Sequence, residues 1–209
     1  METIVLAGGG GHCKSCIEII EKAEKFSIIG ILDRNTSVQS VLGYPVLGDD
    51  NKIIELVEKR HSFLVTVGQI KSSKVREIIF EKILLAHGKL PIIIAPNASI
   101  SKYAVVEKGT IVMQNCIVNV DARIGFNTVI NNNSLIEHDV VIGNHCHIST
   151  NSVINGDCSI GNRVFIGSGS VILNGISITN DVIVGAGSIV NKDIKVSGTY
   201  VGNPAKKIN

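Results

Sequence analysis

The sequence predicts two fold classes in one chain: a small α/β domain, followed by an all-β domain that coils as a parallel β-helix. Two observations lead to this prediction. Residues 1–91 alternate apolar strand-like runs with helix-like runs, whereas residues 100–190 carry Ile or Val at every sixth position. A chain with 21 Gly, 4% aromatic residues and no Trp also suits tight turns around a narrow aliphatic interior.

The first domain is expected over residues 1–91. Its apolar runs and helical spacings alternate as strands 3–6, 26–32 and 63–67 and helices 15–25, 52–60 and 74–85. This order predicts a small Rossmann-like parallel sheet with helices packed on it. A domain of about ninety residues offers only half of the usual dinucleotide-binding fold, so we expect a nucleotide or a nucleotide sugar rather than a dinucleotide.

A glycine-rich turn, Gly8–Gly11, lies between the first strand and the first helix. Backbone N–H groups that no side chain shields can approach an oxyanion closely, which is the geometry of a phosphate site. Asp33 ends the second strand, where a carboxylate can accept hydrogen bonds from ribose hydroxyls. Cys13 replaces the third glycine of the usual fingerprint, so the pattern alone also fits a tight turn without a ligand.

The period of six dominates the rest of the chain. Sixteen positions are all Ile or Val: Ile100, Val106, Val112, Val118, Ile124, Ile130, Ile136, Ile142, Ile148, Ile154, Ile160, Ile166, Ile172, Ile178, Val184 and Val190. The residue two before each is small or Val in every case except Ile176. Because residues two apart on a strand point to the same side, each hexapeptide directs one small and one aliphatic side chain inward.

Gly, Asn and Asp gather between these strands, as in Gly143-Asn144, because they tolerate the positive φ of a tight corner. Three hexapeptides then close a triangular coil, and successive coils stack about 4.8 Å apart. A β-sandwich does not fit, because the phase of the repeat never resets at a turn. We expect the β-helix over residues 92–196 and a C-terminal tail over residues 197–209.

Charge and composition exclude several classes of protein. The formal net charge of +2 provides no basic stripe for nucleic acid, and no apolar run approaches the ~20 residues that span a bilayer. The first residues show no secretory signal, so we expect a cytoplasmic protein. We expect the five cysteines to be buried free thiols, and the pair Cys13 and Cys16 to hold neither a metal nor a redox disulfide.

Three motifs carry a resemblance to a known family. They are Gly8-Gly9-Gly10-Gly11-His12, then Ile136-Glu137-His138-Asp139 with Val141-Ile142-Gly143 and His147, and finally Tyr200-Val201-Gly202-Asn203-Pro204-Ala205-Lys206. On these motifs the chain resembles, almost end to end, the hexapeptide-repeat sugar acetyltransferases of the bacillosamine, perosamine and sialic acid biosynthesis group. The resemblance implies a left-handed coil, a homotrimer with active sites between subunits, acetyl-CoA as co-substrate and no metal.

By this resemblance His138 is the general base. A sugar amine that attacks a thioester must lose a proton, and a neutral imidazole can accept that proton near neutral pH. Asp139 would orient the ring and stabilise the imidazolium. Members of this family often carry Glu in place of Asp139, so Glu137 could orient the ring instead.

The resemblance also implies the binding residues. Those for acetyl-CoA are His147, Gly156, Gly167, Ala186 and Lys206, among which Gly156 would direct its N–H at the thioester carbonyl oxygen. Those for the nucleotide sugar are Gly8, Gly10, Gly11, His12, Asp33 and Gly68, together with Asn131 as a substrate contact. We expect His145 to be an ordinary surface residue.

The expected activity is acetyl-CoA-dependent N-acetylation of the 4-amino group of a UDP- or GDP-linked 4-amino-4,6-dideoxyhexose, for a surface glycan. O-acetylation of a sialic acid or a related sugar is one alternative, since His138 could also activate a hydroxyl. A non-catalytic regulatory protein that binds a nucleotide sugar is another. A gamma-type carbonic anhydrase is disfavoured, because His138 and His147 lie half a coil apart and start on different faces.

Overall fold

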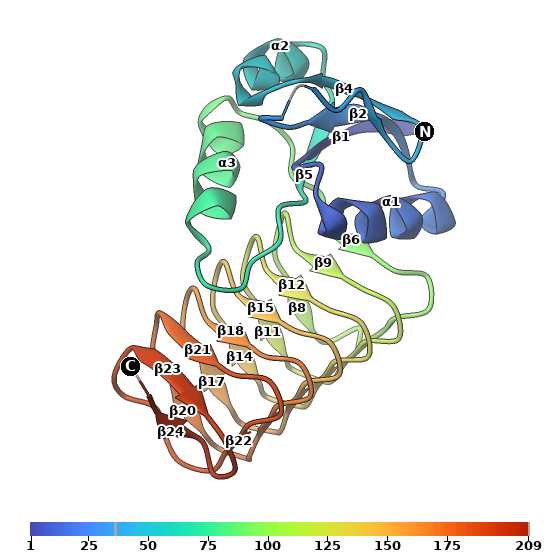
Figure 1. Cartoon of the computed structure of the whole chain (residues 1–209). Helices are drawn as coiled ribbons and strands as arrows, with labels where there is room; N and C mark the ends of the chain where they lie inside the picture. Colours follow the sequence, from blue (N-terminus) through green and yellow to red (C-terminus); the bar gives the residue numbers. More distant parts are fainter. Residues whose placement is uncertain (36, 209) are drawn as a thin grey trace. The chain divides into compact units, whose positions relative to one another are not determined.

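The computed structural model describes residues 1–35 and 37–208 of the chain (Figure 1). These residues form two compact units. The first contains Met1–Gly68 and Lys74–Pro96, and the second contains Gln69–Ser73 and the chain from Asn97 onward. The short segment Gln69–Ser73 therefore packs with the repeat region, although in the sequence it interrupts the first unit.

The first unit is a sheet with helices on both sides. It contains β1 (Glu2–Ala7), α1 (Gly11–Ala23), β2 (Phe26–Leu32), β3 (Ser40–Val41), β4 (Tyr44–Gly48), the 3₁₀ helix η1 (Asp50–Lys52), α2 (Ile53–Glu58), β5 (Ser62–Val65), α3 (Lys74–Leu85) and β6 (Ile93–Ile94). The strand order is β3-β4-β2-β1-β5. All of these strands are parallel except β3, which is antiparallel to β4.

The order of the strands explains where the helices lie. The connection through α1 runs from β1 to β2, whereas the connection through α2 runs in the opposite direction across the sheet, from β4 to β5. Because parallel crossovers are right-handed, α1 and α2 cover opposite faces of the sheet, as Figure 1 shows. Strand β1 is buried over most of its length, and β5, the last strand of the sheet, is buried throughout.

The strand–helix order matches the sequence prediction, with two local differences. Residues 40–48 form a hairpin, β3–β4, which the sequence did not predict. Leu42 and Gly43 join its strands with φ of 48° and 87°, and because Leu is unusual in such a turn, no hairpin signal stood out. In addition, α1 begins at Gly11 rather than near residue 15, with Gly10 as its N-cap. The glycine-rich turn therefore runs directly into the first helical residue.

The second unit is a parallel β-helix with three faces. Face 1 contains β7 (Ser99–Ile100), β10 (Ile117–Val118), β13 (Leu135–Ile136), β16 (Val153–Ile154), β19 (Val171–Ile172) and β22 (Ile189–Val190). Face 2 contains β8 (Val105–Val106), β11 (Arg123–Ile124), β14 (Val141–Ile142), β17 (Ser159–Ile160) and β20 (Ser177–Ile178). Face 3 contains β9 (Ile111–Val112), β12 (Val129–Ile130), β15 (His147–Ile148), β18 (Phe165–Ile166), β21 (Val182–Val184), β23 (Gly198–Val201) and β24 (Lys206–Lys207).

Each coil contains three hexapeptides, as the sequence predicts. Strands pair in parallel with the strand eighteen residues further on, for example Ile117 with Leu135. From Val112 to Val190 every Ile or Val of the period is at most 3% exposed. These side chains form the predicted aliphatic interior, in which each one stacks on the equivalent side chain of the neighbouring coil along the length of the β-helix.

The small inward residues are buried as well, and several of them are polar. Their hydroxyl and thiol groups donate to carbonyl oxygens of the next coil, as from Ser152 to Gly167 at 3.0 Å and from Cys146 to Gly161 at 3.0 Å. Buried donors are thereby satisfied without breaking the strand ladder. All five cysteines are free and buried, as expected from the sequence.

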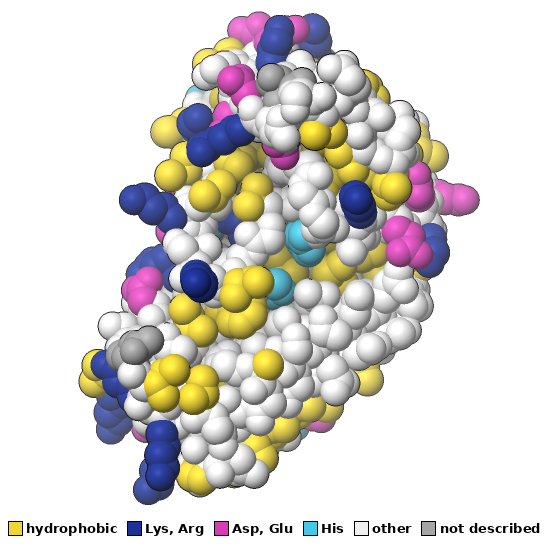
Figure 2. Space-filling model, viewed as in Figure 1, with side chains coloured by type: hydrophobic (Ala, Val, Ile, Leu, Met, Phe, Trp, Pro, Cys, Tyr) yellow, Lys and Arg dark blue, Asp and Glu magenta, His cyan; other side chains and the backbone are white. Residues whose placement is uncertain are grey.

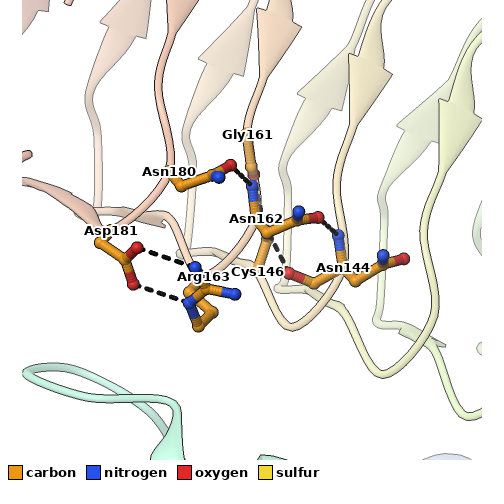
Figure 3. Close-up of polar contacts among 7 residues, drawn as sticks. All are labelled: Asn144, Cys146, Gly161, Asn162, Arg163, Asn180 and Asp181. Carbon is orange, nitrogen blue, oxygen red and sulfur yellow. Dashed lines mark hydrogen bonds and ion pairs between the residues drawn. The ribbon is translucent and has the colours of Figure 1, made fainter. Parts of the chain in front are cut away.

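The corners follow the period of six. Fourteen corner residues have φ between 51° and 69°: Gly109, Asn115, Asp121, Asn127, Asn133, Asp139, His145, Asn151, Asp157, Arg163, Gly169, Gly175, Asp181 and Gly187. At the corner between faces 2 and 3, Asn side chains link the coils (Figure 3). The Asn144 N–H donates to Asn162 Oδ1 at 2.8 Å, and the Asn162 N–H donates to Asn180 Oδ1 at 2.7 Å.

The C-terminal residues extend the β-helix. Strand β23 pairs in parallel with β21, and β24 returns antiparallel to β23. Lys206 and Lys207 form β24 and are exposed. Figure 2 shows basic side chains gathered around this end of the chain.

Candidate active site

The histidine predicted as general base lies at the corner between faces 1 and 2. His138 follows β13, and its Nδ1 lies 2.8 Å from Oδ2 of Asp139. Glu137 is engaged elsewhere, since its Oε2 accepts a hydrogen bond from Asn119 Nδ2 at 2.9 Å. The sequence left open whether Asp139 or Glu137 orients the His138 ring, and Asp139 is therefore the carboxylate in contact with it. With φ of 62°, Asp139 also forms the corner.

Gly156 lies one coil further on, directly beside the His138 ring. A Cβ at this position would lie 2.6 Å from Cε1 and 2.7 Å from Nε2 of His138. Any side chain at residue 156 would therefore displace the imidazole, which explains the glycine. The Gly156 N–H donates to no acceptor within residues 1–35 and 37–208, so it can donate to a ligand.

The surroundings of His138 define its charge and tautomer. The hydrogen bond to Asp139 raises the pKa of His138, and the negative charges of Glu137 and Asp157 add to this increase. Because a carboxylate can only accept, the neutral ring carries its proton on Nδ1 and presents an unprotonated Nε2. The side chain is 52% exposed. This arrangement can accept a proton from a nucleophile that approaches from solvent.

The nucleotide-site candidates of the first unit gather at the carboxyl ends of β1, β2 and β5. The chain connections that follow β1 and β5 run in opposite directions along the sheet. Open α/β sheets bind ligands at the carboxyl ends of two such neighbouring strands. Gly8 has φ of +117°, and a Cβ there would lie 2.5 Å from Val67 Cγ2. Thr66 Oγ1 donates to the Gly8 carbonyl at 2.6 Å. The turn is therefore packed tightly against the end of β5.

The other end of the turn is open. Gly10 is the N-cap of α1, and no side chain of residues 1–35 or 37–208 caps this helix. A Cβ at Gly10 or at Gly11 would meet no atom of the described part of the chain within 4 Å. The N-terminus of a 13-residue helix thus faces open space, where its N–H groups and its dipole favour an anionic phosphate.

Asp33 holds the turn in place. Its Oδ2 accepts the Gly9 N–H at 2.6 Å, and its Oδ1 accepts the Asn35 N–H at 2.8 Å. Each carboxylate oxygen has a second acceptor position, so a ribose hydroxyl can still bind there. At the start of α1, a Cβ on Gly68 would lie 3.7 Å from Cβ of His12, which places these two candidates side by side.

One residue that supports this edge was not found from the sequence. Arg76 of α3 is 1% exposed, and its Nη1 donates to the carbonyls of Val65 at 3.0 Å and Val67 at 2.7 Å. Burial lowers the pKa of Arg76 to about 10, so the group remains cationic at neutral pH. Arg76 fixes the end of β5 and adds positive charge behind the turn. A lone Arg in an amphipathic pattern is normally solvent-exposed, so the pattern carries no sign of this role.

His147 and Asn131 contact each other on face 3. His147 is 7% exposed, with Nε2 3.1 Å from Nδ2 of Asn131 and Nδ1 2.8 Å from the carbonyl oxygen of Gln69. The ring of Phe165 packs edge-on at 5.3 Å between centroids. Both ring nitrogens are therefore occupied within the chain. The expected contacts of His147 with acetyl-CoA and of Asn131 with substrate stay predictions.

The candidates for acetyl-CoA binding divide between two corners of the β-helix. Gly156 lies beside His138, between faces 1 and 2. Gly167 and Ala186 lie between faces 3 and 1, where a Cβ on Gly167 would lie 2.5 Å from the Ala186 nitrogen. Lys206 lines a pocket of about 240 Å³ at the C-terminal end of the unit. One chain thus does not bring His138 together with Gly167 and Ala186.

Comparisons with known proteins agree with this division into two parts. Residues 3–83 match the PglD N-terminal domain family. Residues 121–156 and 157–192 each match the bacterial transferase hexapeptide family, a model of six repeats. A search of curated protein sequences found no match.

Several solved structures match the whole chain. The acetyltransferase domain of PglB from Neisseria gonorrhoeae FA1090 has a TM-score of 0.94 and 28% identity, with 100% of both chains covered. PerB from Caulobacter crescentus, in complex with CoA and GDP-perosamine, has a TM-score of 0.93 and 32% identity, with 100% of this chain and 98% of that chain covered. The chain belongs to the hexapeptide-repeat sugar acetyltransferases.

Membership in the sugar acetyltransferases confirms three predictions. The family resemblance seen in the motifs is correct, and so is the fold, a parallel-sheet unit followed by a left-handed parallel β-helix. The protein is an acyltransferase.

One expectation for this acetyltransferase is wrong. His145 is not a surface residue, since it is only 7% exposed. Its Nδ1 lies 2.8 Å from Asn127 Nδ2, and its ring packs edge-on against Phe126 at 5.1 Å. The side chain turns back from its corner onto the previous coil, which the sequence period alone does not show.

No helix within residues 1–35 and 37–208 is both long and apolar enough to cross a membrane. Over the same ranges, no three His, Cys, Asp or Glu side chains are grouped so that they could hold a metal ion.

Proposed function

We propose that the protein transfers the acetyl group of acetyl-CoA to the 4-amino group of a nucleotide-linked 4-amino-4,6-dideoxyhexose. The observation that carries this proposal is the His138 ring, hydrogen-bonded at Nδ1 to Asp139 and close to Gly156 at Nε2. This pair provides a base with a defined tautomer beside a glycine N–H, which together suit attack of an amine on a thioester.

The relatives support the two substrates. The Caulobacter crescentus protein is a perosamine N-acetyltransferase solved with CoA and GDP-perosamine, and variants with a histidine replaced by Asn or Ala were solved with the same ligands. The Neisseria gonorrhoeae domain was solved with acetyl coenzyme A. These ligands support acetyl-CoA and a nucleotide-linked amino sugar as the substrates of this chain.

The proposed reaction needs no covalent enzyme intermediate. The amine attacks the carbonyl carbon of the thioester, and the new C–N bond forms while the carbonyl oxygen gains negative charge. The Gly156 N–H donates to that oxygen. His138 Nε2 accepts the proton that the nitrogen loses, and Asp139 stabilises the imidazolium. The C–S bond then breaks, and the CoA thiolate recovers the proton.

The first unit would hold the nucleotide. The Gly8–Gly11 turn and the N-terminus of α1 fit the diphosphate, because they present backbone N–H groups without side chains. Asp33 would orient this turn through Gly9, and it retains acceptor positions for a ribose hydroxyl. UDP-sugars and GDP-sugars could both make these contacts, so the choice between the two nucleotides is decided by assay.

We expect the complete site to lie between two copies of the chain in a homotrimer. The two corners that carry the candidate residues lie at opposite edges of face 1. Between them face 1 presents an outward column of aliphatic side chains, each half-buried or exposed: Ile117, Leu135, Val153, Val171 and Ile189. Covering such a column stabilises an oligomer. Three-fold packing through it would bring one corner of each copy toward the other corner of its neighbour.

The test is release of free CoA thiol from acetyl-CoA, with UDP- and GDP-linked 4-amino-4,6-dideoxyhexoses and free sialic acid as acceptors. Loss of the general base in His138→Asn should lower the rate with the amino sugar by about 10²–10⁴. His87→Asn is the matched control, because His87 is exposed in the first unit and has a positive φ that Asn tolerates. No release with either amino sugar would contradict the proposal.

The same experiment separates the alternatives. Thiol release with sialic acid alone would favour O-acetylation. Calorimetric binding of a nucleotide sugar without any thiol release would favour a regulatory protein.

A further inference from the structure

Asn155, which directly precedes Gly156, is bonded twice to one carbonyl oxygen of the next coil. Its backbone N–H donates to the oxygen of Ile172 at 3.1 Å, and its side-chain Nδ2 donates to the same oxygen at 2.7 Å. The first bond belongs to the pairing between coils, and any residue with a backbone N–H could make it. The second bond needs a donor on the side chain, and its length lies at the short end of the usual range.

The equivalent residues of the neighbouring coils do not make this second bond. Because a coil has eighteen residues, the same place in successive coils is occupied by Asn119, Glu137, Asn155 and Leu173. Asn119 directs its Nδ2 to the carboxylate of Glu137 at 2.9 Å. An ionised Glu has no donor, and Leu has no polar group. Among these four residues, the one that holds a main-chain oxygen with its side chain is therefore the one before Gly156.

The two bonds of Asn155 help to set the direction of the Gly156 N–H. The peptide group that joins these residues is planar, so its N–H follows the orientation of the Asn155 backbone. Glycine has more backbone freedom than other residues, so this peptide group depends on its neighbours for a fixed orientation. One bond from the main chain and one from the side chain hold Asn155 in place. On the other side, the Gly156 carbonyl oxygen accepts the Gly175 N–H at 3.0 Å.

A fixed orientation matters for the chemistry proposed for this N–H. A donor stabilises the charge on a thioester oxygen best when it already points to the place where that charge develops. The Gly156 N–H donates to no acceptor within residues 1–35 and 37–208, so no hydrogen bond of its own fixes its direction. Its direction therefore depends on the residues that flank it.

We propose that Asn155 is a positioning residue, which holds the peptide group before Gly156 so that its N–H is aimed at the carbonyl oxygen of acetyl-CoA. Asn155 acts through Gly156 and needs no contact with the reacting atoms. This inference rests on the proposed function and adds one residue to the machinery of the same site.

The first test replaces Asn155 by Ala, which removes the side-chain bond and keeps the backbone bond. Loss of a whole oxyanion donor lowers kcat about 10²–10³-fold, and a donor that is kept but less well aimed should cost less. We expect kcat with the preferred amino sugar to fall by about 3–10-fold, while the KM values for both substrates stay within about twofold. The acidic limb of the kcat/KM profile should not move, because His138 and Asp139 keep their contact.

Asn162→Ala is the matched control. It also removes one hydrogen bond between an Asn side chain and the main chain of another coil, but at the corner between faces 2 and 3. Its kcat should equal that of the wild type. An equal loss of kcat in both variants would show a general effect of weakened contacts between coils, and the positioning role would be wrong.

The second test observes the carbonyl group directly. Infrared spectra of acetyl-CoA labelled with ¹³C at the carbonyl carbon report how strongly a donor polarises the C=O bond. The band should lie at lower frequency in the wild-type complex than in free acetyl-CoA, and in the Asn155→Ala complex it should return part of the way. A band at the wild-type position in Asn155→Ala would overturn the inference. Because this measurement uses no acceptor sugar, it tests Asn155 separately from the choice of acceptor in the proposed reaction.

Discussion

Replacing Gly156 by Ala tests the geometry of the candidate base most directly. The new Cβ would lie 2.6 Å from Cε1 and 2.7 Å from Nε2 of His138, whereas ordinary van der Waals contact begins at 3.4 Å. The ring must therefore retreat by about 0.8 Å to make room. A displacement of about 1 Å in a reacting group can lower a rate 10²-fold. We expect kcat of Gly156→Ala to fall by about 10–100-fold.

The fold should tolerate this change. The His138 side chain is 52% exposed and can turn toward solvent. Gly156 has no left-handed φ, so the backbone accepts an alanine. The melting temperature should therefore stay within about 2 °C of the wild type. Thiol release at saturating substrate measures kcat, and thermal unfolding of the same preparation measures stability.

A double variant shows whether the effect runs through the His138 ring. In a His138→Ala background the ring is gone and the new Cβ has room, so Gly156→Ala should cause no further loss of rate. An undiminished kcat in the single variant would refute the reasoning. So would an equal loss in both backgrounds, because Gly156 would then act on the thioester independently of His138.

Three further predictions follow from other contacts. Asp139→Asn removes the charge that raises the pKa of His138, so the acidic limb of the kcat/KM profile should move to lower pH; an unmoved limb would show that another group titrates. Gly8→Ala forces a side chain into a backbone with φ of +117° and against the end of β5. Urea denaturation should therefore show a loss of about 2–4 kcal/mol in the free energy of unfolding. A loss below about 0.5 kcal/mol would contradict this strain. Asn162→Ala leaves the Asn144 N–H without its acceptor (Figure 3), and thermal unfolding should show a free energy of unfolding lower by about 1–2 kcal/mol. Asn162→Asp keeps an acceptor oxygen at this position and should restore most of that loss.

Periodic features were predictable because each coil repeats the same local geometry. The inward Ile and Val residues, such as Ile136 and Ile154, and the small residues beside them are buried as the period of six requires. The corners at Asp139 and Asp157 have the positive φ that their residue types suggest. The motif around His138 was also recognisable, because its residues are neighbours in the chain.

Contacts between distant residues were not predictable in the same way. The choice of Asp139 over Glu137 as the partner of His138 depends on Asn119, which lies one coil earlier and binds Glu137. The burial of His145 depends on Phe126, nineteen residues away. The hairpin at residues 40–48 was missed because Leu42 is not a usual turn residue.

The sequence by itself therefore determined the two fold classes, the length of a coil and the family, since these depend on short spacings that recur or on runs of adjacent residues. Only the tertiary structure decided how the side chains are used. It set Gly156 against the ring of His138, tied His147 to the carbonyl of Gln69 and buried His145 against Phe126. Each of these facts joins positions far apart in the chain, where burial and hydrogen bonding are set by packing rather than by local pattern.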